Sequence, residues 1–372
     1  MKSLRIASVS DLHLGHKKNN TSDIVANLKK AFPDNAVTGE LDIIFLVGDV
    51  FDGLLNLPSD DVDIIDAWIH SLLNICARHD IILRILEGTP SHDWKQSRRF
   101  IHVAEMIKSP VDVKYITELS IEYINKFDIN VLYIPDEWRP TTDKTLIDVH
   151  DLLKAKGLTQ VDYAVMHGAF KYQLPEFIKA STHDAEEYLK IVREFIFIGH
   201  VHEHTRYKRI IAQGSFDRLA HGTEGPKGHV RVHVSEQRKH VVFVENKTAK
   251  IFKTIDCTTL NLEDTLQKVR DTLTINEPPP NSYIRILADI DNPILSNMSV
   301  LISQYPLYMW SKLVKDNTDD VEEINTEQSD ESYTPITITR DNIVSLLLDR
   351  VSVITVDKVI ISSSMRILNE VL

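Results

Sequence analysis

Five short apolar runs in the first 200 residues each end in a cluster of Asp or His side chains. The runs are nearly continuous in apolar residues rather than alternating, which is typical of strands buried on both faces of a sheet. The carboxyl ends of parallel strands meet at one edge of an open α/β sheet, and ligands bind there. The sequence therefore predicts an α/β fold with a polar site at that edge. The runs and the clusters that follow them are 5–10 with Asp11 and His13, 42–47 with Asp49 and Asp52, 81–86 with Ser91, His92 and Asp93, 162–166 with His167, and 195–198 with His200 and His202.

The same texture continues to about residue 250. Between the strands, apolar residues from 65 to 76 recur with the spacing of one helix face. We therefore expect a layered β-sandwich core, flanked by helices, that occupies residues 1–255. Its further strands are expected at 129–134, 209–213, 229–234 and 240–245.

The pattern changes after about residue 254. Residues 261–273 predict a helix with Asn261 as its N-cap. A proline-rich stretch follows, and then residues 283–290 predict a strand. A smaller α+β accessory domain over residues 256–312 is the simplest interpretation.

Two further segments follow the accessory domain. Residues 316–331 contain eight acidic residues and neither Lys nor Arg, so a flexible acidic loop is expected over 313–336. Apolar periodicity returns in residues 337–372. This last segment predicts C-terminal helices that either cover the sheet or dock on a partner.

Composition limits the classes of function. The net charge of −12 argues against a broadly basic surface that coats nucleic acid, although cations bound in a cleft can still receive a phosphate. The apolar runs are shorter than the roughly 18 residues that span a bilayer, and no signal-peptide pattern precedes Asp11. We therefore expect a cytoplasmic protein that does not enter membranes. Its two cysteines, Cys76 and Cys257, are expected to be reduced.

The residue types in the clusters indicate a metal site. Carboxylates and imidazoles without thiolates suit Mn, Fe, Zn or Mg rather than a structural zinc site. Two cations held close together need a shared carboxylate, and Asp49 on a Gly-Asp turn suits that role. The glycines before Asp49 and His200 are expected to let the backbone turn sharply. Asp11 and His13 stand two apart, as do His200 and His202, so extended backbone would point each pair the same way.

The order of these motifs resembles a known family. DxH, GDxxD, a GNHD-like loop, H-G and GHxH, in that order over residues 1–205, are the signature of calcineurin-like metallophosphoesterases. Within that family the chain is similar to SbcD-type nuclease subunits, including those of phage recombination systems. The supporting stretches are "DLHLGH" (11–16), "GDVFD" (48–52), "QGSFDRLAHGTEGPKGHVRV" (213–232) and "VFVENKTAKIFKTI" (242–255).

The resemblance implies two divalent cations, Mn²⁺ or alternatively Mg²⁺. It implies that one cation is bound by Asp11, His13, Asp49 and His202, and the other by Asp49, His167, His200 and an Asn of the GNHD loop. That Asn is absent here, and Ser91 stands where its carbonyl is expected. Ser91 is therefore expected to bind the second metal or to hold a ligand water, with Thr89 as the alternative.

The resemblance also implies a reaction and partners. His92 would protonate the leaving oxygen, with Asp52 and Asp93 orienting it. The protein would be a metal-dependent exonuclease or endonuclease acting at DNA ends in recombination, repair or replication. It would form a homodimer and bind an SbcC-type ABC ATPase through its C-terminal helices, and its accessory domain would cap the site or bind DNA.

Several alternatives stay open. The same site suits a phosphatase or a cyclic-nucleotide phosphodiesterase, although neither explains the region after Asp256. The altered loop also permits a metal-bound but inactive scaffold for the ATPase. Six basic residues are candidate DNA contacts, and a solvated surface charge is the alternative role for each. They are Lys17, Lys18, Lys95, Arg98, Arg99 and Arg218.

Overall fold

The computed structural model describes residues 3–55, 59–175, 177–178 and 180–315. The chain divides into two compact units, 1–317 and 318–372. The second unit, with the predicted docking segment 337–372 and nearly all of the predicted acidic loop, lies outside the described residues. The expected start of that loop at residue 313 falls inside a strand, Met309–Lys315.

The first sheet combines four parallel strands with an antiparallel pair. Its order is β12-β11-β1-β2-β3-β4. Strands β1 to β4 run parallel, while β11 pairs antiparallel with β1 and with β12. The strands are β1 (Leu4–Val9), β2 (Ile43–Val47), β3 (Ile82–Leu86), β4 (Val113–Ile116), β11 (Gly228–Val234) and β12 (Lys239–Glu245).

The second sheet has the order β5-β6-β7-β8-β10-β9. Its four inner strands, β6, β7, β8 and β10, run parallel, and the two edge strands run antiparallel to their neighbours. The strands are β5 (Ser120–Ile124), β6 (Ile129–Ile134), β7 (Val161–Gly168), β8 (Val192–His200), β9 (Thr205–Tyr207) and β10 (Ile210–Ala212).

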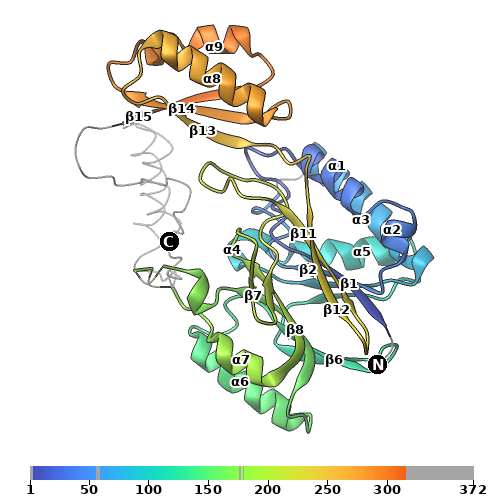
Figure 1. The fold of residues 1–372 in the computed structure, drawn as a ribbon. Helices are drawn as coiled ribbons and strands as arrows, with labels where there is room; N and C mark the ends of the chain where they lie inside the picture. Colours follow the sequence, from blue (N-terminus) through green and yellow to red (C-terminus); the bar gives the residue numbers. More distant parts are fainter. Residues whose placement is uncertain (1–2, 56–58, 176, 179, 316–372) are drawn as a thin grey trace, which may run out of the picture. The chain divides into compact units, whose positions relative to one another are not determined.

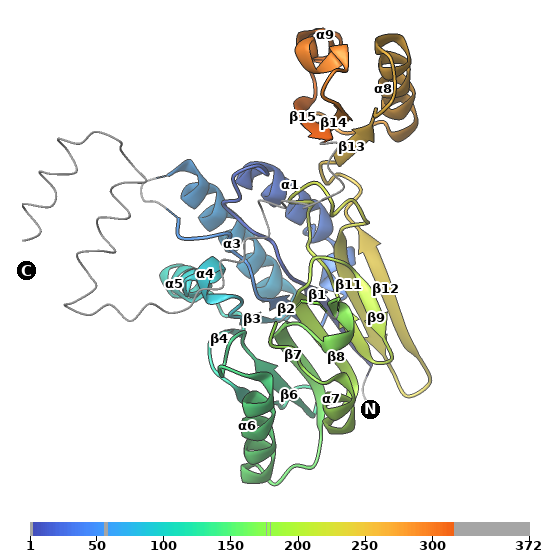
Figure 2. The ribbon, with the colours of Figure 1, turned by 90° about the vertical axis from the view of Figure 1, so that its left-hand side faces the viewer.

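The two sheets pack face to face around a shared core. Phe45 of the first sheet contacts Tyr133 and Phe197 of the second within this core. The outer face of the first sheet is covered by α1 (Thr21–Ala31), α3 (Asp60–His79) and α5 (Arg99–Met106). The outer face of the second is covered by α6 (Thr142–Ala155) and α7 (Ala185–Ile191), as Figures 1 and 2 show. The predicted α/β sandwich flanked by helices is confirmed.

A third, smaller sheet follows the sandwich. Its order is β13-β14-β15, and all three strands run parallel. Helix α8 begins after Asn261, whose side chain accepts a hydrogen bond from the backbone N–H of Asp264, as the sequence predicts. The boundary expected between residues 255 and 256 falls inside β13. The elements are β13 (Phe252–Asp256), α8 (Leu262–Asn276), β14 (Tyr283–Asp289), α9 (Met298–Gln304) and β15 (Met309–Lys315).

The remaining helical elements are short turns. They are α2 (Ala36–Gly39), α4 (Pro90–Asp93), η1 (Gln96–Arg98), η2 (Lys171–Gln173) and η3 (Pro293–Ser296). Of these, α4 carries residues of the site. Among the residues that the structure describes, no helix combines the length and the apolar content that crossing a membrane requires.

Candidate metal centre

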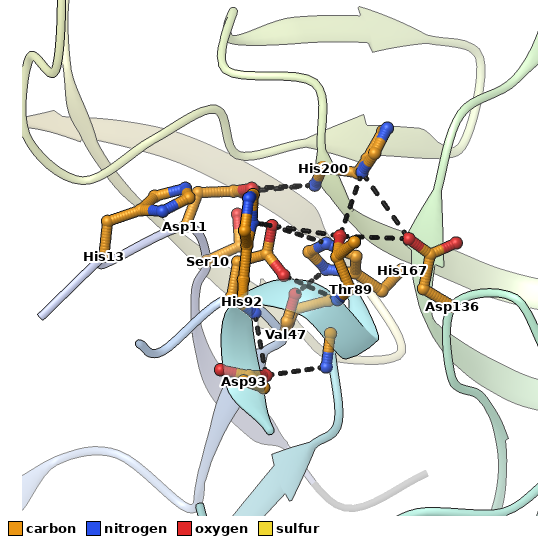
Figure 3. A network of polar contacts seen from close by, with 12 residues as sticks. Ser10, Asp11, His13, Val47, Thr89, His92, Asp93, Asp136, His167 and His200 are labelled. Carbon is orange, nitrogen blue, oxygen red and sulfur yellow. Dashed lines mark hydrogen bonds and ion pairs between the residues drawn. The ribbon is translucent and has the colours of Figure 1, made fainter. Parts of the chain in front are cut away.

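The polar clusters at the strand ends meet in one place. Two groups of three residues bring their ligand atoms within 4.8 Å of one another. The first ligand group consists of Asp11, His13 and His202, and the second ligand group consists of Asp49, His167 and His200. Figure 3 shows residues of both groups converging from several strand ends. The arrangement can bind divalent cations and is compatible with a metal-dependent hydrolase.

In the first ligand group, two imidazoles face each other. His13 Nδ1 lies 2.9 Å from Asp52 Oδ1, so this nitrogen carries the proton. His13 Nε2 therefore presents its lone pair, and it lies 3.1 Å from His202 Nε2. Two imidazole nitrogens at that separation suit a shared cation, because metal ligands approach one another this closely.

In the second ligand group, His167 is fully buried in β7. Its Nδ1 donates a hydrogen bond to the carbonyl oxygen of Val47 at 2.7 Å. Among the residues that the structure describes, its Nε2 has no hydrogen-bond partner and faces Asp49 Oδ2 at 3.2 Å. A buried lone pair without a donor is costly in a folded protein unless a cation or a proton occupies it. The residues thus fit a bound cation.

Asp49 lies between the two groups, and its carboxylate contacts Thr89, His92 and His167. Its Oδ2 lies 3.0 Å from His92 Nδ1, and its Oδ1 accepts a 2.6 Å hydrogen bond from the backbone N–H of Thr89. Burial raises the pKa of Asp49, but the nearby imidazoles, above all His167 and then His92, outweigh it and hold that pKa well below its ordinary value. Asp49 is therefore an anion that several groups share.

The backbone at four ligand residues is left-handed. Asp11, His13 and Asp49 have φ near 50°, and His200 has φ of 97°. The expectation of extended backbone is therefore wrong for Asp11 and His13, and for His200 in the second pair. Residues other than Gly rarely adopt such backbone, and it is concentrated at functional sites.

The two glycines of the motifs serve different purposes. Gly48 has φ of +77°, and a Cβ there would lie 2.2 Å from His167 Nδ1. Gly199 lies within β8 and needs no such turn, but a Cβ there would lie 2.3 Å from the carbonyl oxygen of Val47. The sharp turn expected before Asp49 is confirmed, whereas Gly199 is required by close packing against β2.

His92 lies in α4 with its imidazole toward the cluster. Burial lowers the pKa of His92, but the hydrogen bond and the charge of Asp49 outweigh it and raise the pKa above its ordinary value. Its ring centroid is 5.1 Å from that of His13. His92, His13 and Asp49 also form a third group whose ligand atoms lie within 4.8 Å. The position suits either proton transfer or metal binding.

Asp52 and Asp93 are engaged elsewhere than at His92, which the sequence expected them to orient. Asp52 is bonded to His13. Asp93 is fully buried and accepts hydrogen bonds from the backbone N–H groups of Asp49, Phe51 and Gly88 at 2.7–3.1 Å. Burial and the charge of Asp49 raise the pKa of Asp93 to about 7. Its role in this structure is to hold the Gly48-Asp49 turn against the loop that carries His92.

Thr89, not Ser91, lies within the cluster. Thr89 Oγ1 is 3.2 Å from Asp49 Oδ2 and 3.4 Å from His200 Nδ1. Ser91 is exposed, and its backbone carbonyl accepts a hydrogen bond from the indole of Trp94. Thr89 directly follows Gly88, and Pro90 and Ser91 separate it from His92. The alternative ligand is thus the one that the structure brings into place.

Two residues near the site, Asp136 and Lys227, were not among the predicted site residues. Asp136 follows β6, accepts a hydrogen bond from Thr89 Oγ1 at 3.1 Å and lies 3.6 Å from His200 Nδ1. The ammonium of Lys227 is buried and donates to the carbonyl oxygen of His202. Burial and the nearby Arg218 lower the pKa of Lys227 to about 8. Residues 129–134 were an expected strand, but the sequence does not show that Asp136 after it contacts Thr89.

The six basic residues predicted to contact DNA differ in their exposure and in the partners that they already have. Arg99 forms an ion pair with Asp66, with 2.5 Å between Nη2 and Oδ2. Arg218 is half-buried and points to backbone carbonyl oxygens at 3.4–3.5 Å. The backbone carbonyl of Lys18 accepts a hydrogen bond from the Tyr283 hydroxyl. The exposed members are Lys17, Lys95 and Arg98.

Comparisons with known proteins show only a distant likeness of fold. No protein-family model matches the chain, and no curated protein matches its sequence. One crystal structure that it resembles has a TM-score of 0.40 at 11% identity, covering 65% of this chain and 100% of the other. The crystal structure of TT1561 of Thermus thermophilus has a TM-score of 0.38 at 11% identity, with 65% and 99% covered. Function is therefore inferred from the site residues themselves.

Proposed function

We propose that this protein is a two-metal-dependent phosphodiesterase that hydrolyses DNA, as an exonuclease or endonuclease at DNA ends. The observation that supports it most is the position of Asp49, which belongs to the second ligand group and also forms a group with His13. A carboxylate in that position can bind two neighbouring cations at once. Such sites hold and activate phosphate esters.

The chain's own residues have distinct parts in this proposal. Two divalent cations, when bound, would supply an activated water and would neutralise charge on the phosphate. The ligand groups hold these cations, and Asp49 joins them. His92 stands beside Asp49 at 3.0 Å, where it can give its proton to the leaving oxygen. Asp93 keeps the turn and the His92 loop in register through its three backbone hydrogen bonds.

A nucleic-acid substrate is favoured by the exposed residues that follow His92 along the chain, here called the rim. The loop that carries His92 continues into Trp94, whose side chain is 55% exposed, and then into Lys95 and Arg98, which are also exposed. An exposed aromatic ring next to basic side chains suits a base stacked beside its phosphate. A small phosphate ester would need neither.

The first experiment measures hydrolysis by the purified protein with Mn²⁺ or Mg²⁺. Linear duplex DNA, a phosphomonoester, a cyclic nucleotide and bis(p-nitrophenyl) phosphate are compared, with and without an SbcC-type ATPase. We expect DNA hydrolysis that EDTA abolishes. Turnover of the phosphomonoester or the cyclic nucleotide without DNA hydrolysis would favour a phosphatase or cyclic phosphodiesterase. Bound metal without any turnover would favour the scaffold.

A second experiment tests the rim. Because base stacking contributes about 1–3 kcal/mol per base, Trp94→Ala should lower kcat/KM on DNA by about 5- to 150-fold. It should leave kcat/KM on bis(p-nitrophenyl) phosphate unchanged. Trp94→Phe is the matched control and should retain most of the activity on DNA. Equal losses on both substrates would show that Trp94 supports the loop instead.

The partners belong to the same proposal. The DNA-end nucleases that the chain resembles act as homodimers with an SbcC-type ABC ATPase, and we propose the same assembly here. The segment proposed to dock on that ATPase, 337–372, lies outside the described residues. Copurification of the ATPase with the full chain, and its loss on deleting 337–372, is the corresponding test.

A further inference from the structure

We infer that Asp136 is a positioning residue for the second ligand group and acts through Thr89. It accepts the proton of the Thr89 hydroxyl, so that the lone pairs of Thr89 Oγ1 face the cation beside Asp49. The pair of Thr89 and Asp136 would thereby replace the amide ligand that is absent from this chain. This inference rests on the proposed function, because it assumes a cation held by the second ligand group.

The contacts of the Thr89 hydroxyl carry the argument. Oγ1 lies 3.1 Å from Asp136 Oδ2 and 3.2 Å from Asp49 Oδ2. Figure 3 shows the contact between Thr89 and Asp136. A hydroxyl has one proton and two lone pairs, so it can donate to only one of these two carboxylates. Asp49 Oδ2 already faces the imidazoles of His92 and His167, at 3.0 and 3.2 Å. Asp136 is therefore the acceptor that needs the proton.

The spacing of the atoms places Thr89 among the ligands and Asp136 behind it. Ligand atoms about 2.0–2.2 Å from a metal lie roughly 3.0–3.5 Å from their neighbours in tetrahedral or octahedral sites. Thr89 Oγ1 meets that spacing, at 3.2 Å from Asp49 Oδ2 and 3.4 Å from His200 Nδ1. Among the described residues, Asp136 belongs to none of the groups whose ligand atoms lie within 4.8 Å of one another.

The backbone fixes Thr89 in this position. Its N–H donates to Asp49 Oδ1 at 2.6 Å. A Cβ on the preceding Gly88 would lie 2.1 Å from the backbone nitrogen of Asp49, so the loop is pressed against the Asp49 turn. Asp136 comes from the opposite sheet, and its side chain is only 14% exposed. A carboxylate so placed polarises a hydroxyl much as carboxylates polarise metal-bound imidazoles.

The test is a double-mutant cycle on the full chain, with Mn²⁺ binding followed by calorimetry. Wild type should bind two Mn²⁺. Thr89→Val and Asp136→Asn should each weaken the second Mn²⁺, by about 10- to 100-fold, and leave the first unchanged. The double variant should bind no more weakly than Thr89→Val alone, because Asp136 has no hydroxyl left to act on. Asp162→Asn, at the far end of β7, is the matched control for lost charge.

Two further variants sharpen the cycle. Thr89→Asn supplies an amide oxygen that needs no proton acceptor, so it should bind the second Mn²⁺ whether Asp136 is present or replaced by Asn. Thr89→Ser keeps the hydroxyl and should keep the dependence on Asp136. Thr89→Ala, which also lacks the hydroxyl, takes the place of Thr89→Val if that variant does not fold.

The contrary results are distinct. Additive losses in the double variant would overturn the inference, because Asp136 would then act independently of Thr89. So would wild-type binding of both Mn²⁺ ions by Asp136→Asn. In each case the proposed two-metal function survives. If wild type binds fewer than two Mn²⁺, the proposed function fails, and the inference fails with it.

Discussion

The two ligand groups are held in place by different means. In the first, His13 is oriented by the side chain of Asp52, which is 26% exposed, and His13 itself lies outside regular strands. In the second, His167 lies within β7, is fully buried, and is oriented by the backbone carbonyl of Val47. One group thus depends on side-chain partners near the surface, and the other depends on the packing of two sheets.

The difference explains which group tolerates a changed motif. The second group keeps its geometry through strand pairing, in which His167 lies opposite Gly199 and Gly168 opposite His200. Thr89 lies beside this group and is attached to that rigid frame by the hydrogen bond from its N–H to Asp49 Oδ1. The residues of the first group lie in the DxH and GHxH motifs outside such pairing, and backbone hydrogen bonds join Asp11 and His13 to the turn that follows β2. A rigid frame can accept a substitute ligand more readily than a set of turns can.

The largest effect is expected from Asp49→Asn, which removes the anion that joins the groups. The loss should weaken both Mn²⁺ ions at least about 100-fold, more than is typical for partners outside the coordination sphere. DNA hydrolysis should fall to the uncatalysed background. Calorimetry with Mn²⁺ measures the first effect and a nuclease assay the second. Loss of only one Mn²⁺ would mean that Asp49 does not bridge the two groups.

His92→Ala should separate chemistry from metal binding. General-acid catalysis contributes about 10²- to 10⁴-fold, so the rate on DNA should fall by that factor while both Mn²⁺ ions stay bound. The defect should nearly disappear with bis(p-nitrophenyl) phosphate, because p-nitrophenolate leaves without a proton. If the variant instead loses one Mn²⁺, His92 is a ligand in the group that it forms with His13 and Asp49.

Asp52→Asn should affect the first ligand group alone. The variant loses the carboxylate at 2.9 Å from His13 Nδ1, and such losses typically cost about 10- to 100-fold in metal affinity. One Mn²⁺ should bind more weakly while the other keeps its affinity. Asp136→Asn should do the opposite: it should weaken the Mn²⁺ of the second ligand group and leave that of the first unchanged. If both variants weaken the same Mn²⁺, the division into two groups is wrong.

Much of the sandwich, and most of the residues that meet in the candidate site, could be predicted from local sequence. Long apolar runs such as 129–134 matched β6 residue for residue, because a strand buried on both faces needs little but apolar side chains. The short edge strands were missed: β4 is half-exposed and alternates too little to stand out. Motif spacing identified Asp11 and His13 without showing that their backbone is left-handed.

What the sequence could not show depends on contacts between distant segments. Asp136 is one of two acids that follow a proline, and its position matters only because β6 lies in the sheet that faces Thr89. Likewise, Lys227 reads as one surface lysine among many, yet its ammonium is buried against the carbonyl of His202. The expected Asn of a GNHD-like loop lies between Gly and His. Ser91 is the residue just before His92, and Thr89 is the residue just after Gly88, so either could take its place. The structure places Thr89 within the cluster, and Pro90 after it begins α4.

The smallest effect is expected from Ser91→Ala. This variant decides whether Ser91 or Thr89 takes the place of the expected Asn. Ser91 is exposed, and its hydrogen bond with the Trp94 indole is made by its backbone carbonyl, which the substitution keeps. Mn²⁺ affinity and the rate on DNA should therefore change less than about twofold, within the range usual for surface substitutions. Thr89→Val in the same assay should cost about 10- to 100-fold at the second Mn²⁺. A larger loss from Ser91→Ala than from Thr89→Val would restore Ser91 as the ligand, and would require the loop to rearrange when the cation binds.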